Sequence, residues 1–432
     1  MPPDAKIPAA NDVSQGGSAP PPVLGSPASP PLMEPKPQSA PLRELLAVLL
    51  SLCLGLFLAD AVISLVDDSL ILFFGLHLLA GIRGMVCLFS ILIAIVIYGL
   101  MGLAPMIPKR LFLPVTLFNP VAPLIFVPIT IFFYGHLQVF AWGFSCGQVI
   151  LGLWILKRVQ GGLKFRWPLV ATYQLAARRF SWRNLSVFLL ANVFVLPAVV
   201  MIYLFLCTAV AVDHFSEGFM SLRPAGFSVQ VRKYVRADGK TIQLFPMSHV
   251  AEADFYRKIS LTFPTNSIIL MEGVTDEKNL LTNKISYNRM AKSLGLAEQH
   301  EKFEPTRGEL VMADVDVGQF TRNTIDFLNL VIAVHTQDLN IGMILKLLQY
   351  SPPPHFEEQL FDDLLLKRNQ HLLEEIKSHL PQTDNLMVPW GVAHMPGIAR
   401  EIQKSGFHLD GTQDYMVIRF HGADHQTKGV NK

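Results

Sequence analysis

Long apolar runs separated by short polar stretches dominate the chain from residue 45 to residue 212. Five of these runs reach about 20 mostly apolar residues, the length that crosses a bilayer. They are Leu45–Val66, Gly84–Pro105, Leu111–Gly135, His136–Leu156 and Leu185–Val212. The shorter piece Ser69–Ile82 is typical of an interfacial or re-entrant segment. The pattern predicts a membrane α-helical bundle of about five spans over residues 43–212.

After residue 212 the pattern becomes that of a soluble domain, in which short apolar runs alternate with amphipathic stretches. Strands are expected at 227–234, 241–245, 266–271, 310–313, 386–388 and 415–420. Helices are expected at 251–261, 285–295, 323–336, 341–350, 357–379 and 396–406. Strands that alternate with helices predict a soluble α/β domain with a largely parallel sheet over residues 213–432.

The first 42 residues have no hydrophobic period and are rich in Pro, Ala and Ser. Such a segment cannot bury enough apolar surface to offset the entropy lost on folding. We therefore expect a disordered, Pro-rich tail over residues 1–42. The first apolar run begins too late for a secretory signal peptide.

The composition is that of a membrane protein. Only 16% of the residues are charged, against about 25% in an average soluble domain. The net charge of +2 gives no reason to expect a nucleic-acid partner, and membrane lipid is the expected partner instead. All four cysteines lie before residue 212, so the soluble domain can hold neither a thiolate zinc site nor an internal disulfide.

The stretch from Lys157 to Arg183 carries several basic side chains and no acidic one. The positive-inside rule places it in the cytoplasm, where it would also contact anionic lipid. Counting spans from this stretch puts the amino terminus inside and the C-terminal domain outside. The count changes if Leu111–Leu156 crosses once instead of turning at the Gly135–His136 corner. Asp60, inside the first span, is either a functional residue or a residue at the membrane edge.

Three polar residues follow predicted strands of the soluble domain: His249, Glu272 and His394. Because the carboxyl ends of parallel strands share one edge of a sheet, we expect the three side chains to meet. Two neutral imidazoles and a carboxylate suit Zn²⁺, Mn²⁺ or Co²⁺ with an open position for water. Without a metal, a histidine or Glu272 could act as a general base on water.

Further polar residues could support this site. Arg368 and Asn369 lie in one predicted helix, where they face solvent, clamp a carboxylate or orient Glu272. Asp314 and Asp316 alternate as they would at a strand end. They either bind metal or face solvent at a turn.

The order of these motifs resembles the TraB/Tiki superfamily, which also includes erythromycin-esterase-like and haem-binding ChaN-like proteins. The segments Gly391–His394, Met395–Ile398 and Met271–Val274 are similar to its Gly-x-x-His and Glu motifs. The resemblance covers roughly residues 226–421. One departure is the first motif, Pro246-Met247-Ser248-His249, where proline replaces glycine. Proline forbids a positive φ, which puts activity in question more than the fold.

The resemblance implies a metal-dependent peptidase domain outside the cytoplasm that acts on a protein or peptide substrate. It implies that His249 and His394 ligate a divalent metal (Mn, Co or Zn) or act as acid–base groups. Glu272 would be the base or a further ligand. Arg368 would contact the transition state or a substrate carboxylate.

Two other functions stay open. The same pocket could belong to a non-catalytic domain that binds haem, metal or a peptide, or that regulates the membrane domain. The helical region could instead be the functional part, as Asp60 and the prolines of Leu111–Gly135 suggest. The few charged residues in the spans make an ion path the weaker alternative.

Overall fold

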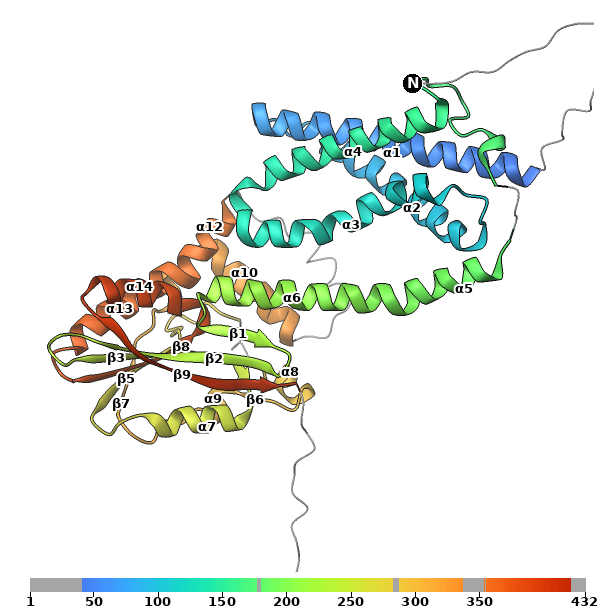
Figure 1. Cartoon of the computed structure of the whole chain (residues 1–432). Coiled ribbons are helices and arrows are strands. Elements are labelled where there is room, and N and C mark those ends of the chain that lie inside the picture. The colour runs from blue at the N-terminus through green and yellow to red at the C-terminus, as the bar shows by residue number, and fades with distance from the viewer. Residues whose placement is uncertain (1–40, 177–179, 283–286, 337–352, 354, 421–432) are drawn as a thin grey trace, which may run out of the picture.

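A helical region is followed by a mixed-sheet domain in the computed structural model, which describes residues 41–176, 180–282, 287–336, 353 and 355–420 (Figure 1). Two predicted segments lie outside these residues. They are the tail over 1–42, except for Pro41 and Leu42, and the helix over 341–350. Pro41 and Leu42 belong to the first helix.

The helical region consists of long apolar helices joined by short turns. Its members are α1 (Pro41–Phe74), α2 (Ala80–Leu103), α3 (Lys109–Phe133), α4 (Leu137–Gln160), α5 (Trp182–Leu190) and α6 (Leu196–Ser216), with a π turn over Ala191–Val195. Within the described residues, four segments are long and apolar enough to cross a membrane by length and composition. They are Pro41–Phe74, Ala80–Leu103, Lys109–Gln160 and Trp182–Ser216.

The segment Lys109–Gln160 has 52 residues, more than twice the length of one span, and contains α3 and α4. A 3₁₀ turn over Tyr134–His136 separates the two helices, which fold back on each other (Figure 1). α3 runs through its four prolines without a break. The piece Ser69–Ile82, expected to be interfacial or re-entrant, is divided between two elements: Ser69–Phe74 continue α1, and most of the remainder belongs to the turn before α2.

The core of the helical region lies around α1. Leu50, Leu54 and Phe57 of α1 are fully buried and pack with residues of α2, α3 and α4. The outer helices expose many large apolar side chains, such as Ile150 and Ile202. Apolar surfaces of this extent require a partner other than water.

The C-terminal domain contains one seven-stranded sheet in its described part. Its strands are β1 (Met220–Arg223), β2 (Gly226–Val235), β3 (Thr241–Met247), β5 (Ser267–Met271), β7 (Glu309–Met312), β8 (Asn385–Gly391) and β9 (His408–Arg419). The order is β1-β2-β3-β8-β5-β7, with β9 also paired to β2. A short pair, β4 (Val250–Ala251) and β6 (Ala297–Glu298), stands apart.

The sheet is mixed, so the prediction of a largely parallel sheet is too simple. The pairs β3–β8, β8–β5 and β5–β7 are parallel, as the short apolar runs predicted. The pairs of β2 with β1, β3 and β9 are antiparallel. Only the parallel half therefore brings several strand ends to one edge.

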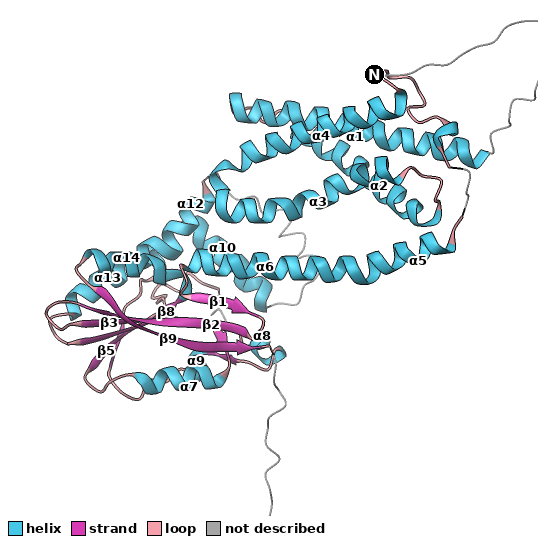
Figure 2. Cartoon of the chain, in the orientation of Figure 1, coloured by secondary structure: helices cyan, strands magenta, loops and turns pink. Residues whose placement is uncertain are grey.

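Helices cover both faces of the sheet (Figure 2). The helices of this domain are α7 (Ala253–Thr262), α8 (Asn288–Ser293), α9 (Gln299–Lys302), α10 (Arg322–Thr336), α12 (Phe356–Phe361), α13 (Lys367–His379) and α14 (Met395–Lys404). A π turn over Asp362–Leu366 joins α12 to α13. Alternate residues of β8 show the layering: Val388 packs with α13 and α14, whereas Met387 packs with α7.

Replacing Gly226 by alanine tests the pairing of β2 with β9. Gly226 has a φ of +139° and a Cβ there would overlap the carbonyl oxygen of Ile418. Gly226→Ala should lower the free energy of unfolding by roughly 2 kcal/mol or more. Urea unfolding of the full chain in detergent measures the change, followed by the fluorescence of Trp390 in a background in which the four other tryptophans are replaced by phenylalanine. Trp390 is the only tryptophan after residue 182.

The matched control is Gly411→Ala in the paired strand β9. Its Cβ would meet no atom within 4 Å, and its φ is not in the left-handed region. Its effect should stay within about 1 kcal/mol, the cost of a simple glycine exchange. Equal effects of the two substitutions would contradict the pairing.

Candidate functional site

Glu272 directly follows β5 and stands at the carboxyl end of the parallel strands. Its Oε2 accepts a hydrogen bond of 2.5 Å from the backbone N–H of Gly391, at the end of β8. Its Oε1 accepts one of 2.7 Å from Nη2 of Arg368. A Cβ at Gly391 would lie 3.3 Å from Oε2, so glycine allows this close approach. The carboxylate is 9% exposed and is fixed from both sides.

Arg368, on α13, joins Glu272 to a second carboxylate. Its Nε and Nη2 donate to the two oxygens of Asp314 at 2.9 and 2.7 Å, in a bidentate pair. Asp314 is fully buried and also accepts from the backbone N–H groups of Gly273 and Val315. We call Glu272, Arg368 and Asp314 the ion cluster.

His394 faces the ion cluster from the 3₁₀ turn after β8, Val392–His394. Its Nδ1 lies 2.7 Å from Oδ1 of Asn369, which can only accept, so the proton is assigned to Nδ1. Nε2 then carries a lone pair and lies 3.6 Å from Oε1 of Glu272. This separation is too long for a hydrogen bond.

Burial decides the charge of His394. It lowers the pKa of the imidazole from 6.5 to about 4, although the charge of Glu272 acts in the opposite direction. Burial also lowers the pKa of Arg368, but the hydrogen bonds and charges of Asp314 and Glu272 outweigh it and the net shift is upward. At neutral pH the group formed by the ion cluster and His394 therefore contains two carboxylates and one cation.

The structure leaves His249 beside this group rather than in it. His249 is exposed, and its ring stacks on Tyr287 with 5.1 Å between centroids. In the described residues it makes no hydrogen bond or ion pair with Glu272 or His394, yet its charge influences the pKa of His394. Pro246 lies inside β3, paired with Trp390, where no positive φ is needed. The proline therefore fits the local backbone.

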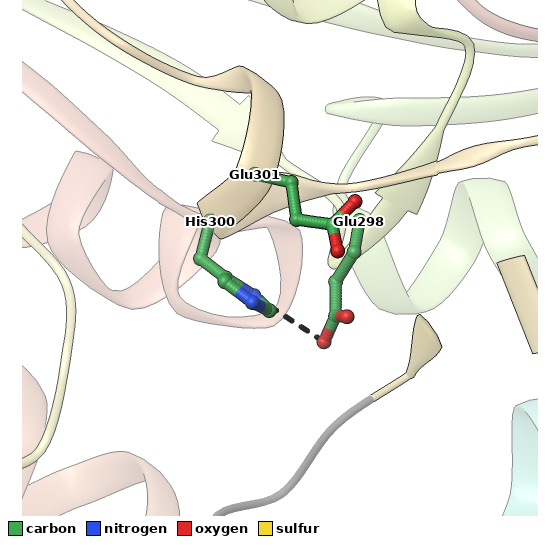
Figure 3. Close-up of side chains that lie close together, drawn as sticks. All are labelled: Glu298, His300 and Glu301. Atoms are coloured by element: carbon green, nitrogen blue, oxygen red, sulfur yellow. Dashed lines mark ion pairs between the residues drawn. The ribbon is translucent and has the colours of Figure 1, made fainter. Parts of the chain in front are cut away.

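A second cluster was not predicted. Glu298, His300 and Glu301 converge at the start of α9, and their ligand atoms lie within 4.8 Å of one another (Figure 3). His300 Nδ1 is 3.3 Å from Oε1 of Glu298, a buried carboxylate that also accepts from the N–H of Tyr287. In the part of the chain that is described, this group alone meets that distance limit, and the predicted ligands His249, Glu272 and His394 do not.

The spacing Glu-x-His-Glu was the sequence signal for this second cluster. The spacing does not predict the cluster by itself, because the burial of Glu298 cannot be read from a polar stretch. Asp316, the other aspartate of the predicted strand end, has a structural role. It accepts from the N–H groups of Gly318 and Glu277 and caps a short turn.

No family model, curated protein or solved structure matches the chain. The family suggested by the motifs around Glu272 and His394 therefore stays a prediction. Function has to be inferred from the geometry of the ion cluster and of His394.

Removing Arg368 should destabilise the domain strongly. Arg368→Met leaves the buried carboxylates of Glu272 and Asp314 without their cation, at an expected cost of about 3–5 kcal/mol in the free energy of unfolding. Arg322→Met is the control, because Arg322 is 85% exposed and pairs with Asp326 on the helix surface. Its cost should stay below about 1 kcal/mol. Urea unfolding of the full chain measures both, and similar costs would refute the role of the cluster.

The pKa of His394 predicts how stability depends on pH. The unfolded chain binds a proton near pH 6.5 and the folded chain only near pH 4, so acid favours unfolding within this window. With chelator present, the free energy of unfolding should fall by about 3 kcal/mol from pH 6.5 to pH 4 on account of this group. His394→Gln should remove this contribution to the pH dependence of the free energy of unfolding. His408→Gln, at an exposed histidine, should leave the pH dependence unchanged. The same slope in both variants would contradict the assignment.

Proposed function

We propose that this protein is a membrane-anchored hydrolase whose C-terminal domain works as a metal-dependent peptidase. The observation that carries the proposal is the pair of electron-rich atoms 3.6 Å apart, His394 Nε2 and Glu272 Oε1. Neither atom carries a proton that it could donate to the other. Two such atoms repel each other unless a cation or a proton lies between them.

Distance and charge support a divalent cation at this pair. Bonds of about 2.1 Å in tetrahedral geometry separate two ligand atoms by about 3.4 Å, close to the 3.6 Å between Nε2 and Oε1. Two carboxylates against one guanidinium leave one negative charge, which a cation would offset. A neutral imidazole oriented by Asn369 is the usual form of a metal-ligating histidine.

Each residue of the site has its own role in this proposal. His394 and Glu272 hold a divalent ion such as Mn²⁺, Co²⁺ or Zn²⁺, which would acidify a water molecule and polarise a carbonyl. A histidine with a pKa of about 4 is a weak base at neutral pH, which favours the ligand role for His394. His249, exposed beside the site and within electrostatic range of His394, would be the group that moves the proton. Arg368 is only 14% exposed and its donors bind Asp314 and Glu272, which favours positioning over contact with substrate.

The arrangement of the helices supports an extracytoplasmic site. The turn Tyr134–His136 and the basic stretch after Gln160 lie at opposite ends of α4. The hydroxyl of Tyr134 donates a hydrogen bond of 3.3 Å to Glu357 of the C-terminal domain. This domain therefore contacts the end of α4 that lies opposite the basic stretch. With the basic stretch in the cytoplasm, the amino terminus is inside and the C-terminal domain outside.

A non-catalytic binding domain is the second candidate. The separation of His249 from the ion cluster favours it, because a metal site with only two donors binds but lacks a group for proton transfer. In that case Glu272 and His394 would be required for binding a metal, haem or a peptide, and no turnover would be lost with them.

Metal content and hydrolysis of a peptide mixture by the full chain in detergent test the proposal. Glu272→Gln and His394→Ala should lose both the bound metal and hydrolysis. His249→Ala should keep the metal and lose about 10²-fold or more in rate. Glu309→Gln, an exposed carboxylate on the neighbouring strand β7, should match the wild type.

Two outcomes would contradict this assignment. Loss of the metal in His300→Ala but not in His394→Ala would move the site to Glu298, His300 and Glu301. Metal or haem binding that needs His394, without hydrolysis by any form, would support the binding domain.

A further inference from the structure

The loop that follows α4, residues 161–170, is built into the helical region. The side-chain amide of Gln160, the last residue of α4, donates to the carbonyl groups of Arg166 at 3.1 Å and Leu169 at 2.5 Å. The backbone N–H of Val170 donates to Oγ of Ser51 on α1 at 2.9 Å. Leu169 and Val170 are buried in the core of the helical region. The loop is therefore held at a fixed position against α1 and α4.

Four consecutive side chains of this loop, alternately basic and aromatic, are exposed. They are Lys164, Phe165, Arg166 and Trp167, and we call them the basic–aromatic segment. Phe165 is 69% exposed and Trp167 is 63% exposed, although the backbone beside them is hydrogen-bonded to α4. The stretch from residue 157 to residue 183 contains no acidic residue that could compensate the two cations. A contiguous exposed patch of this kind indicates contact with a partner.

The last turns of α4 add two further cations next to this segment. Lys157 and Arg158 are both exposed. The guanidinium of Arg158 lies 5.5 Å from the ring centroid of Trp154, which precedes it by one helical turn. A tryptophan ring below an arginine tip is typical of the membrane–water interface, where the ring lies at the level of the headgroups and the cation in water. This end of α4 therefore has the features of a membrane surface.

Two polar levels along α1 support the same placement. At one level Ser51 binds the loop through Val170, and at the other Asp68 binds Arg83 of α2 at 2.6 Å. The rise of α1 from Ser51 to Asp68 is about 25 Å, close to the hydrocarbon thickness of a bilayer, about 30 Å. With the ion pair of Asp68 at one surface of the bilayer, the basic–aromatic segment lies at the other. It is then level with the lipid headgroups and not far out in water.

The geometry points to an anionic phospholipid as the ligand of the basic–aromatic segment. Its two cations, with Lys157 and Arg158 of α4 beside them, complement the phosphate and carboxylate of an anionic headgroup. Phe165 and Trp167 fit the layer between the headgroups and the acyl chains. An acidic protein segment would match the charge, but it would leave these two rings in contact with polar groups. The inference is independent of the function proposed for the C-terminal domain.

Quenching of Trp167 by brominated lipids tests this inference in the full chain, reconstituted in nanodiscs of phosphatidylcholine. The difference in emission between the wild type and Trp167→Phe isolates this residue from the other four tryptophans. Brominated phosphatidylserine should quench Trp167 at a mole fraction about fivefold or more below that of brominated phosphatidylcholine. The preference should fall as the salt concentration rises, because salt screens exposed charges.

Lys164→Gln combined with Arg166→Gln should lower this preference several-fold. The matched control, Arg257→Gln with Lys258→Gln, removes the same charge from α7, on the side of the sheet away from the helical region (Figure 1), and should leave it unchanged. Equal quenching by the two lipids, no quenching by either, or an unchanged preference in the Lys164/Arg166 variant would overturn the inference. An emission of Trp167 that responds to polyglutamate but not to phosphatidylserine would also overturn it, in favour of an acidic protein segment.

Discussion

The C-terminal site depends on the ion pairs that join Arg368 to Glu272 and Asp314. The two carboxylates come from the ends of the neighbouring strands β5 and β7 and would repel each other without a cation. Arg368 bridges them with bonds of 2.7 Å to each. Because the cluster is almost dry, removing one charge costs far more than a surface pair would. The strand ends, α13 and the acidic side chain of the site are therefore fixed together.

α13 positions both sides of the site with two consecutive residues. Arg368 holds Glu272, and Asn369 holds the ring of His394 through Nδ1. The π turn Asp362–Leu366 leads into α13, with only Lys367 between it and Arg368. Such turns shift the direction in which the following side chains point and are frequent at functional sites. The distance between His394 Nε2 and Glu272 Oε1 is thus set by two side chains of one helix, and not by two separate loops.

The sequence was most informative where one physical signal dominated. The apolar runs at 266–271 and 386–388 predicted the parallel strands β5 and β8, because strands buried on both faces are apolar throughout. The strand ends then predicted that Glu272 and His394 come together. β1 escaped prediction because its four residues follow directly on the last long apolar helix. Asp314 and Arg368 were weaker expectations, since residues 54 positions apart are paired by tertiary packing alone.

His249 and Glu298 show what sequence spacing does not predict, namely the contacts of individual side chains. His249 follows β3 as expected, but its ring stacks on Tyr287, and it makes no hydrogen bond or ion pair with Glu272 or His394 among the described residues. Glu298 lies in a polar stretch, and it is buried where β6 pairs with β4. Both outcomes depend on side-chain orientation at the end of a short strand. That orientation is set by contacts that no local pattern encodes.

An anomalous difference map of the full chain crystallised with Mn²⁺ is the most direct measurement of the central claim. A peak between His394 Nε2 and Glu272 Oε1 is the predicted result. A peak only at Glu298, His300 and Glu301, or no peak at either position, would contradict the account.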